Sequence, residues 1–486
     1  MEKNNQKNIE IFENAPVPSA VMKMAVPTVL SMIVTVLYNM VDAFFVGLTK
    51  DASKFAAVNI ATPVFLFFMA AGNIYGMGGS SFLSRALGEK KFQKVKNISS
   101  FSFYAGLLTG IAGGIIMLTF MNPILNAIGT TETTFQYTKD YLSVISFGGP
   151  FVVLANAFTN IIRGEGESKK SMQGMMIGTV VNIILDPIFI LDELFGIKLL
   201  GMGVKGAALA TVIGNAVTIS MYVIHILSKH SILSINIKDF KAKDGIMKQV
   251  LIIGLPASLT NILMSMSNIL TNKLLSGYYF QEVTSPSLLP FITNFSNGVP
   301  VFADVPTAGM GVAMKANMLT IFVQLGIGMG ISPLIGYNYG SRNFKRLKSI
   351  LKFAIFLNIL AGTLLTSVYF IFTKPIISIF SRDAAVVALG EIMLRALMVS
   401  TPVIGILFAL NFAFQAMGKG IQSLILAVSR QGLIFFPLIL ILNRITGLYG
   451  IIYAQPVADI VSIIMAIIMF SKTAKELKTN SIPGAV

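Results

Sequence analysis

Long apolar segments recur along the whole 486-residue chain and constrain its fold more than any other feature. A helix needs roughly 20 apolar residues to cross a hydrocarbon core of about 30 Å. A chain with twelve such segments cannot hide them in water-soluble domains, so we expect an all-α integral membrane protein with twelve transmembrane helices. The predicted spans are Met24–Gly47, Phe55–Gly79, Ile98–Phe120, Tyr141–Ile162, Ser171–Leu191, Gly203–Leu227, Met247–Leu275, Gly311–Gly336, Ile350–Phe372, Glu391–Ala416, Ile421–Leu442 and Gly447–Phe470.

The composition excludes several classes of function. Hydrophobic residues make up 54% of the chain and charged residues only 12%, which is about half the usual share for soluble proteins. Because there is no cysteine, disulfides, thiolate metal sites and cysteine nucleophiles are excluded. No Gly-rich phosphate loop of the GxxxxGK[ST] type is present, so ATP is not the direct energy source. We see no nucleophile–base constellation and expect no enzymatic activity and no metal or other resident cofactor.

The net charge of +16 is concentrated in alternate connections between the predicted spans. The positive-inside rule places such connections, and here both termini, in the cytoplasm. Because the charges are spread over separate loops, we expect no nucleic-acid partner. The basic connections are 85–96, 163–170, 229–248, 342–348 and 472–478.

The two halves of the sequence repeat each other. Gly76–Lys96 aligns without a gap to Gly328–Lys348, and shorter matches pair Gly166 with Gly418 and Gly203 with Gly447. Six spans per copy give both copies the same orientation, a known plan for transporters. The predicted organisation is a cytoplasmic N-terminal segment (1–23), an N-lobe of helices 1–6 (24–228), a cytoplasmic inter-lobe linker (229–246), a C-lobe of helices 7–12 (247–470) with an extracellular insertion (276–310), and a cytoplasmic tail (471–486).

Three segments within this repeated frame resemble one known family. Asn182–Pro187, Gly203–Thr211 and Pro333–Gly340, taken in order, are similar to the multidrug and toxic compound extrusion (MATE) transporters, and to their MepA-like bacterial branch. The resemblance implies a twelve-helix fold of two six-helix lobes related by a pseudo-twofold repeat, in the bacterial cytoplasmic (inner) membrane. It also implies ion-coupled antiport that exports amphipathic, often cationic, xenobiotic compounds.

Two acidic residues within predicted spans are candidates for the coupling chemistry, because ionisable groups in a membrane are costly and mark functional sites. Asp186 follows Asn182 by four residues, so both lie on one helix face, and Asn39 precedes Asp42 by three. Carboxylate and amide oxygens there can hold Na⁺, or the two acids can share protons. The sequence leaves H⁺ and Na⁺ open as coupling ions.

The family resemblance adds to this set of candidate residues. It implies that Asp42, Asn182, Asp186 and Thr211 together form a cation site of the N-terminal lobe. The second half differs, since Thr271 and Leu438 stand at the places that correspond to the two acids. Asp459, in the last span, is either a structural residue or part of a second site.

Further residues are candidates for helix bending and for contacts with the transported compound. Pro27 lies near one end of the helix that carries Asp42, where it either bends that helix during transport or forms a static kink. The chain's methionines supply adaptable apolar lining. The predicted cavity residues are Asn156, Asn160, Asn411, Gln415 and Met329.

The leading functional prediction is therefore a secondary active multidrug efflux transporter that works as a monomer through alternating access of its two lobes. A lipid-linked oligosaccharide flippase of the same superfamily is the alternative, although it favours a strongly basic interior and the spans here contain acids. A channel requires a pore-lining repeat and a filter, which the sequence does not show. The sequence alone does not name the exported compound.

Overall fold

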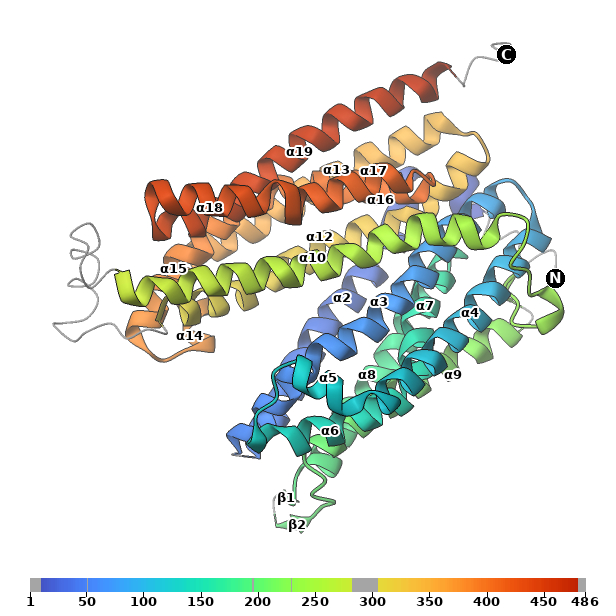
Figure 1. Cartoon of the computed structure of the whole chain (residues 1–486). Helices are drawn as coiled ribbons and strands as arrows, with labels where there is room; N and C mark the ends of the chain where they lie inside the picture. Colours follow the sequence, from blue (N-terminus) through green and yellow to red (C-terminus); the bar gives the residue numbers. More distant parts are fainter. Residues whose placement is uncertain (1–9, 50, 195, 229, 282–304, 480–486) are drawn as a thin grey trace. The chain divides into compact units, whose positions relative to one another are not determined.

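The computed structural model describes residues 10–479 except residues 50, 195, 229 and 282–304, and nearly all of these residues are helical (Figure 1). Ten of the described helices are long and apolar enough to cross a membrane, and the number of spans rises to twelve if each of two bent pairs is counted as one span. The predicted fold class is thus confirmed. The first half contains α2 (Val17–Leu48), α3 (Ala52–Gly88), α4 (Phe92–Thr119), α5 (Met121–Ala127), α6 (Glu132–Phe147), α7 (Gly149–Gly164), α8 (Ser168–Ile190), the short antiparallel strands β1 (Glu193–Leu194) and β2 (Ile197–Lys198), and α9 (Val204–Leu227).

The second half repeats this order of elements. It contains α10 (Ile246–Gln281), α12 (Val305–Gly340), α13 (Phe344–Ile371), α14 (Thr373–Phe380), α15 (Ala384–Met398), α16 (Thr401–Ala416), α17 (Gly420–Val428), the π-helical turn η2 (Ser429–Leu433), α18 (Phe435–Thr446) and α19 (Leu448–Thr479). A constant offset in residue number relates the starts of α4, α6, α7 and α8 to those of α13, α15, α16 and α17. The internal repeat predicted from the sequence is therefore present in the helices.

Matched glycines in the two copies share an unusual backbone conformation. Gly166 and Gly418, just before α8 and α17, have φ angles of +100° and +79°. Gly203 and Gly447, just before α9 and α19, have φ angles of +57° and +63°. Residues with a Cβ rarely adopt these angles, so glycine is required in each repeat where the backbone turns from one helix into the next. The sequence matches therefore reflect a shared backbone requirement.

Two predicted spans are each broken into a pair of helices. Tyr141–Ile162 was expected to be one helix, but α6 and α7 meet at 58°, and within the predicted span Glu391–Ala416 α15 and α16 meet at 50°. Pro150 and Pro402 stand in the first turns of α7 and α16, where a missing N–H costs nothing but a helix cannot easily continue from upstream. Each of these two predicted spans is therefore a bent pair of helices rather than one continuous helix.

The predicted span Ile421–Leu442 is also interrupted. It consists of α17, the π-helical turn η2 and α18. Single π-helical turns inside α-helices are uncommon and often occur at functional sites. Arg430 lies within this turn. The predicted insertion 276–310 is shorter than expected, because α10 extends to Gln281 and α12 begins at Val305; residues 282–304 lie outside the described residues.

The described chain divides into two compact units. The first contains residues up to Ser258 together with Met329–Ile350 and Ala413–Gly420, and the second contains Leu259–Gly328, Leu351–Phe412 and residues from Ile421 onward. The first unit therefore includes the first repeat and one end of each of α10, α12, α13 and α16. The predicted lobe boundaries at 229–246 remain a prediction from the sequence repeat.

Apolar side chains lie both inside each unit and on its outer helix faces. Phe68, Leu142 and Ile145 belong to the core of the first unit, and Met393 and Ile439 belong to that of the second. Large apolar side chains on the long helices are exposed, which suits helices that face lipid. Examples of these exposed residues are Leu108, Ile115, Ile184, Ile224, Leu364 and Ile464. The chain is thus a multi-pass membrane protein.

A short segment that precedes α2 is fixed within the first unit by the side chain of Phe12. This ring is fully buried and stacks on Tyr337 of α12, with a centroid distance of 4.7 Å. Arg346 donates a hydrogen bond of 2.7 Å from Nε to the carbonyl oxygen of Phe12. The hydroxyl of Tyr337 donates to Glu13 at 2.7 Å. Gly166, from the first repeat, leaves the room that the Phe12 ring occupies.

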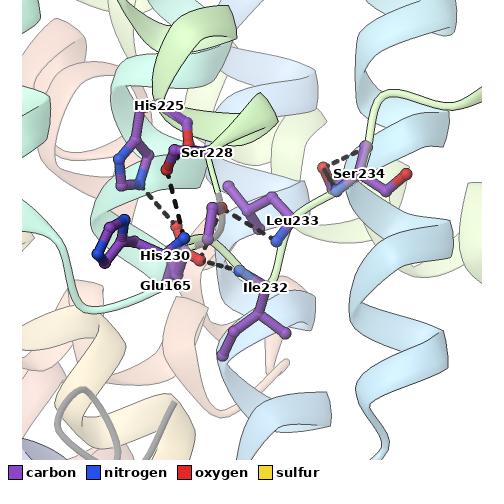
Figure 2. A network of polar contacts seen from close by, with 9 residues as sticks. Glu165, His225, Ser228, His230, Ile232, Leu233 and Ser234 are labelled. Atoms are coloured by element: carbon purple, nitrogen blue, oxygen red, sulfur yellow. Dashed lines mark hydrogen bonds and ion pairs between the residues drawn. The ribbon is translucent and has the colours of Figure 1, made fainter. Parts of the chain in front are cut away.

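The start of the linker that follows α9 is bound to an acidic side chain at the end of α7. Glu165, at the end of α7, is fully buried and accepts hydrogen bonds from the hydroxyl of Ser231 at 2.8 Å and from the backbone N–H of Ile232 (Figure 2). The His225 ring lies 3.2 Å from the same carboxylate. This buried carboxylate therefore holds the start of the linker against the first repeat.

The linker continues along α4 through side chains of that helix. Ser100 and Tyr104 donate hydrogen bonds to the carbonyl oxygens of Asn236 and Ile235 at 2.8 and 3.0 Å. Ser234 donates to the Asp239 carboxylate at 2.6 Å, and this bond lowers the pKa of Asp239. Residues 231–240 are thus a fixed part of the first unit.

Candidate functional site

The carboxylate of Asp186 is the most deeply buried acid among the predicted coupling residues. It lies on α8 with an exposed fraction of 0%, and Asn182, one turn earlier, is 2% exposed. The amide of Asn182 donates a long hydrogen bond of 3.4 Å to Oδ1 of Asp186. Within the described residues, Oδ2 of Asp186 and Oδ1 of Asn182 have no hydrogen-bond partner. Two buried oxygens therefore remain available to a ligand.

Asp42 provides the second carboxylate, from α2. Helix α2 packs against α8, and the carboxylates of Asp42 and Asp186 interact electrostatically. Oδ1 of Asp42 is buried and also has no hydrogen-bond partner among the described residues. The structure thus brings together two acids that are 144 positions apart in the chain. That they form a cation site remains a prediction.

The third helix of the site is α9, which packs against α8 and contributes Thr211. This threonine is 3% exposed, and its hydroxyl oxygen lies 3.2 Å from the hydroxyl of Tyr38 on α2. Gly178 of α8 allows α9 to approach closely, because a Cβ there would overlap Thr218 and the backbone of Gly214. A glycine-lined contact therefore holds the helix that carries Thr211 against the helix that carries Asp186.

Two tyrosines belong to the site although the sequence analysis did not select them. Tyr38 and Tyr141 each interact electrostatically with both Asp42 and Asp186. Tyr38 precedes Asp42 by four residues and so shares its helix face, which is a signal that the sequence contains. Tyr141, on α6, has no such signal, because only the fold brings it near the acids.

These groups together form an acidic, oxygen-rich site without a cationic side chain. Among the described residues no lysine, arginine or histidine forms an ion pair with Asp42 or Asp186. Two neighbouring carboxylates that are shielded from water cannot both keep their charge unless a proton or cation accompanies them. Carboxylate, amide and hydroxyl oxygens are ligands for hard cations such as Na⁺. The chemistry of these groups suits either H⁺ or Na⁺, and binding of either ion remains a prediction.

The other predicted residues have varied surroundings. Pro27 lies inside the single helix α2, and its carbonyl oxygen accepts a 2.9 Å hydrogen bond from Ser31. The side chain of Asn39 is outside the described part of the structure, so its predicted role in cation binding remains a prediction.

The predicted cavity residues are distributed over both units. Asn156 donates to the Met69 carbonyl oxygen at 2.8 Å, and Asn160 donates to the Asn156 carbonyl oxygen at 3.1 Å. Asn411 accepts a 2.7 Å hydrogen bond from Ser423 in the second unit. Gln415 is buried, and its backbone carbonyl oxygen accepts a hydrogen bond from Ser81 in the first unit. Met329 is half-buried on α12. Contact of these residues with a transported compound remains a prediction.

Comparisons with known proteins agree with this architecture. A MatE family model matches residues 27–188 and 287–441. The multidrug export protein MepA of Staphylococcus haemolyticus is 30% identical over 455 residues, which cover 94% of this chain and 93% of the relative. MepA of Staphylococcus aureus is 30% identical over 448 residues, with 92% of each chain covered.

Solved structures show the same similarity in three dimensions. A crystal structure of MATE in the straight conformation is 25% identical, has a TM-score of 0.85, and matches over 97% of this chain and 99% of its own. An outward-facing multidrug resistance MATE family transporter of the MOP superfamily is 25% identical with a TM-score of 0.86 and the same coverage. The family model, the curated relatives and the fold together show that this chain belongs to the MatE family of multidrug and toxic compound extrusion transporters.

Proposed function

We propose that this membrane protein is a secondary active multidrug efflux transporter. It exports amphipathic, cationic compounds in exchange for H⁺ or Na⁺ by alternating access. It works as a monomer in the bacterial cytoplasmic membrane with both termini in the cytoplasm. The relatives named as multidrug export proteins support the class of cargo. The distribution of basic loops supports the orientation.

The observation that carries the coupling mechanism is the pair of carboxylates without a cationic partner. Asp42 and Asp186 carry buried oxygens that lack partners among the described residues. Asn182 on α8 and Thr211 on the adjoining α9 add buried neutral oxygens. Binding of H⁺ or Na⁺ removes the unfavourable charge, so the ion stabilises one conformation of α2 and α8 over another. Differential stabilisation of this kind is what couples an ion gradient to the movement of cargo.

The test is efflux of the cationic dye ethidium from cells that make wild type, Asp42→Asn or Asp186→Asn at matched expression. We expect wild type to export the dye and both variants to fall to the background rate, because an amide cannot gain or lose the charge. Asp192→Asn, which changes an exposed acid after α8, is the matched control and should keep wild-type efflux. Coupled efflux in both site variants would refute the site.

Imposed gradients then distinguish the two ions. Proteoliposomes with only a pH gradient or only a Na⁺ gradient should show efflux with one of the two, and that efflux should disappear in Asp186→Asn. A wild-type protein that moves no cationic dye under either gradient would refute export of cationic compounds and would favour lipid-linked cargo instead.

A further inference from the structure

The second unit contains a buried acid, Asp459, whose carboxylate oxygens all have hydrogen-bond donors, unlike those of Asp42 and Asp186. Asp459, on α19, is 2% exposed. Its Oδ1 accepts hydrogen bonds of 2.8 Å from both Arg430 Nε and Gln455 Nε2, and its Oδ2 accepts one of 2.9 Å from Ser400. Every carboxylate oxygen here has a donor, and one donor is a full positive charge.

Arg430 itself is held in a defined place. It lies in the π-helical turn η2, and its guanidinium group stacks over the ring of Phe408 at 5.2 Å from the centroid. The side chain is largely buried, with 14% of it exposed. Because the guanidinium group is covalently attached to the chain, this positive charge does not exchange with cations from solution.

The internal repeat shows that this pair lies on the elements that match those of the coupling site. Counted from the starts of α17 and α8, Arg430 corresponds to Gly178, and counted from α19 and α9, Asp459 corresponds to Asn215. At Gly178 there is no room even for a Cβ beside Thr218. The second repeat has a π-helical turn at this place, and that turn holds the arginine. The two repeats thus differ in charge on equivalent helices.

We propose that Arg430 is a tethered counter-ion that permanently fills the cation position beside Asp459. An exchangeable cation then binds only in the first repeat, so Arg430 determines how many ions are coupled to each transported molecule. The inference rests on the proposed function in one respect, namely that Asp42 and Asp186 form the exchangeable cation site. Its core statement, that Arg430 excludes a solution cation from Asp459, is independent of that assignment.

A purely structural ion pair gives a different expectation. Buried ion pairs contribute little net stability, and the loss of one partner is costly because the other charge remains buried and unpaired. If the pair were only structural, Arg430→Met would lower stability, and the freed carboxylate of Asp459 would take up a proton but no Na⁺. If Arg430 fills a cation position, the freed carboxylate should recruit Na⁺ from solution.

The experiment counts exchangeable cations on the purified full chain. The probes are ²²Na⁺ at neutral pH and proton uptake after a jump from alkaline to acidic pH. In an Asp42→Asn/Asp186→Asn background we expect no exchangeable cation at Asp459. Addition of Arg430→Met should create about one ²²Na⁺ site per chain, and further addition of Asp459→Asn should remove it. Arg444→Met, which deletes an exposed arginine on α18, is the control and should create no site.

A single variant keeps the proposal testable if Arg430→Met does not fold. Asp459→Asn alone, in the otherwise wild-type chain, should leave the number of bound cations unchanged, whereas Asp186→Asn should reduce it. A reduced count in Asp459→Asn, or no new site in Arg430→Met, would overturn the counter-ion role. A wild-type chain that binds no cation would instead refute the coupling site and leave the Arg430 comparison valid.

Discussion

The hydroxyl group of Tyr38 links two helices of the coupling site, α2 and α9. It lies 3.2 Å from the hydroxyl oxygen of Thr211 and interacts electrostatically with both acids. A net hydrogen bond contributes about 1 kcal/mol, which corresponds to roughly a five-fold change in affinity. We therefore expect Tyr38→Phe to weaken cation binding by about five-fold with little loss of stability, as measured by ion titration of transport.

The matched control for this change is Tyr104→Phe, which removes a tyrosine hydroxyl from α4 at the linker. It should leave the cation affinity unchanged. Equal effects of the two substitutions would show that Tyr38 acts only through general stability.

The carboxylate of Asp239 is the residue through which pH should act on the linker. The hydrogen bond from Ser234 lowers its pKa, and Gln93 and Lys96 act in the same direction. A lowered pKa in the folded state means that this group stabilises the fold above its unfolded value of about 3.9 and that the contribution disappears as the pH falls through the folded value. Hydrogen exchange of the 231–240 backbone should therefore increase below about pH 4. The same pH dependence in Asp239→Asn would contradict this role.

At this scale the sequence predicts charged residues better than neutral ones. Asp42 and Asp186 are conspicuous because an acid in a long apolar segment needs an explanation. Tyr141 was missed because a tyrosine is common in apolar segments and only the packing of α6 brings it to the acids. The counter-ion at Asp459 was missed for the same reason, since Arg430 and Asp459 lie 29 positions apart on different helices.

At the scale of elements, substitution of Pro27 tests whether α2 bends during transport. Proline removes one intrahelical hydrogen bond, and Thr28 donates back to the Met24 carbonyl oxygen at 2.8 Å beside it. Side-chain bonds of this kind favour bending of a helix. We expect Pro27→Ala to slow coupled efflux of ethidium at least several-fold while protein levels stay normal. Efflux at the wild-type rate would eliminate the hinge.

The control for this substitution is Pro63→Ala, which changes a proline inside α3 rather than in the helix that carries Asp42. It should preserve coupled efflux. A similar loss in both variants would indicate a general effect of proline removal on the bundle.

Hydropathy does not predict whether a membrane-spanning segment forms one continuous helix. A window of apolar residues predicts that a segment lies in the membrane, and each predicted span does contain helix. It does not reveal whether that helix is continuous, since Gly148, Gly149 and Pro150 are individually tolerated in apolar helices. The π-helical turn at 429–433, which contains Arg430, likewise cannot be predicted from hydropathy, because its residues belong to one continuous apolar segment.

At the scale of the whole molecule, Phe12 connects the start of the chain to residues more than 300 positions away. Its loss should release the 10–15 segment, because a buried phenylalanine contributes about 3–5 kcal/mol relative to alanine. The chain has no cysteine, so a single Cys placed at Ile11 reports its own accessibility. We expect Phe12→Ala to raise the maleimide labelling rate of that cysteine at least about ten-fold.

Met22→Ala provides the comparison, since it removes an exposed apolar side chain from α2. It should not change the labelling rate. Rapid labelling in the otherwise unaltered chain would show that the contacts of Phe12 do not hold the segment in solution.

The attachment of residues 231–240 to α4 also determines where a protease can cut the chain. The five residues from Lys241 to Gly245 are exposed, and Asp244 and Gly245 have φ angles of +60° and +75°, so the backbone turns sharply there before α10 begins. Brief trypsin treatment should therefore cleave after Lys241 or Lys243. The two fragments would correspond to the two repeats, so one polypeptide could be divided at this point into two separately encoded halves.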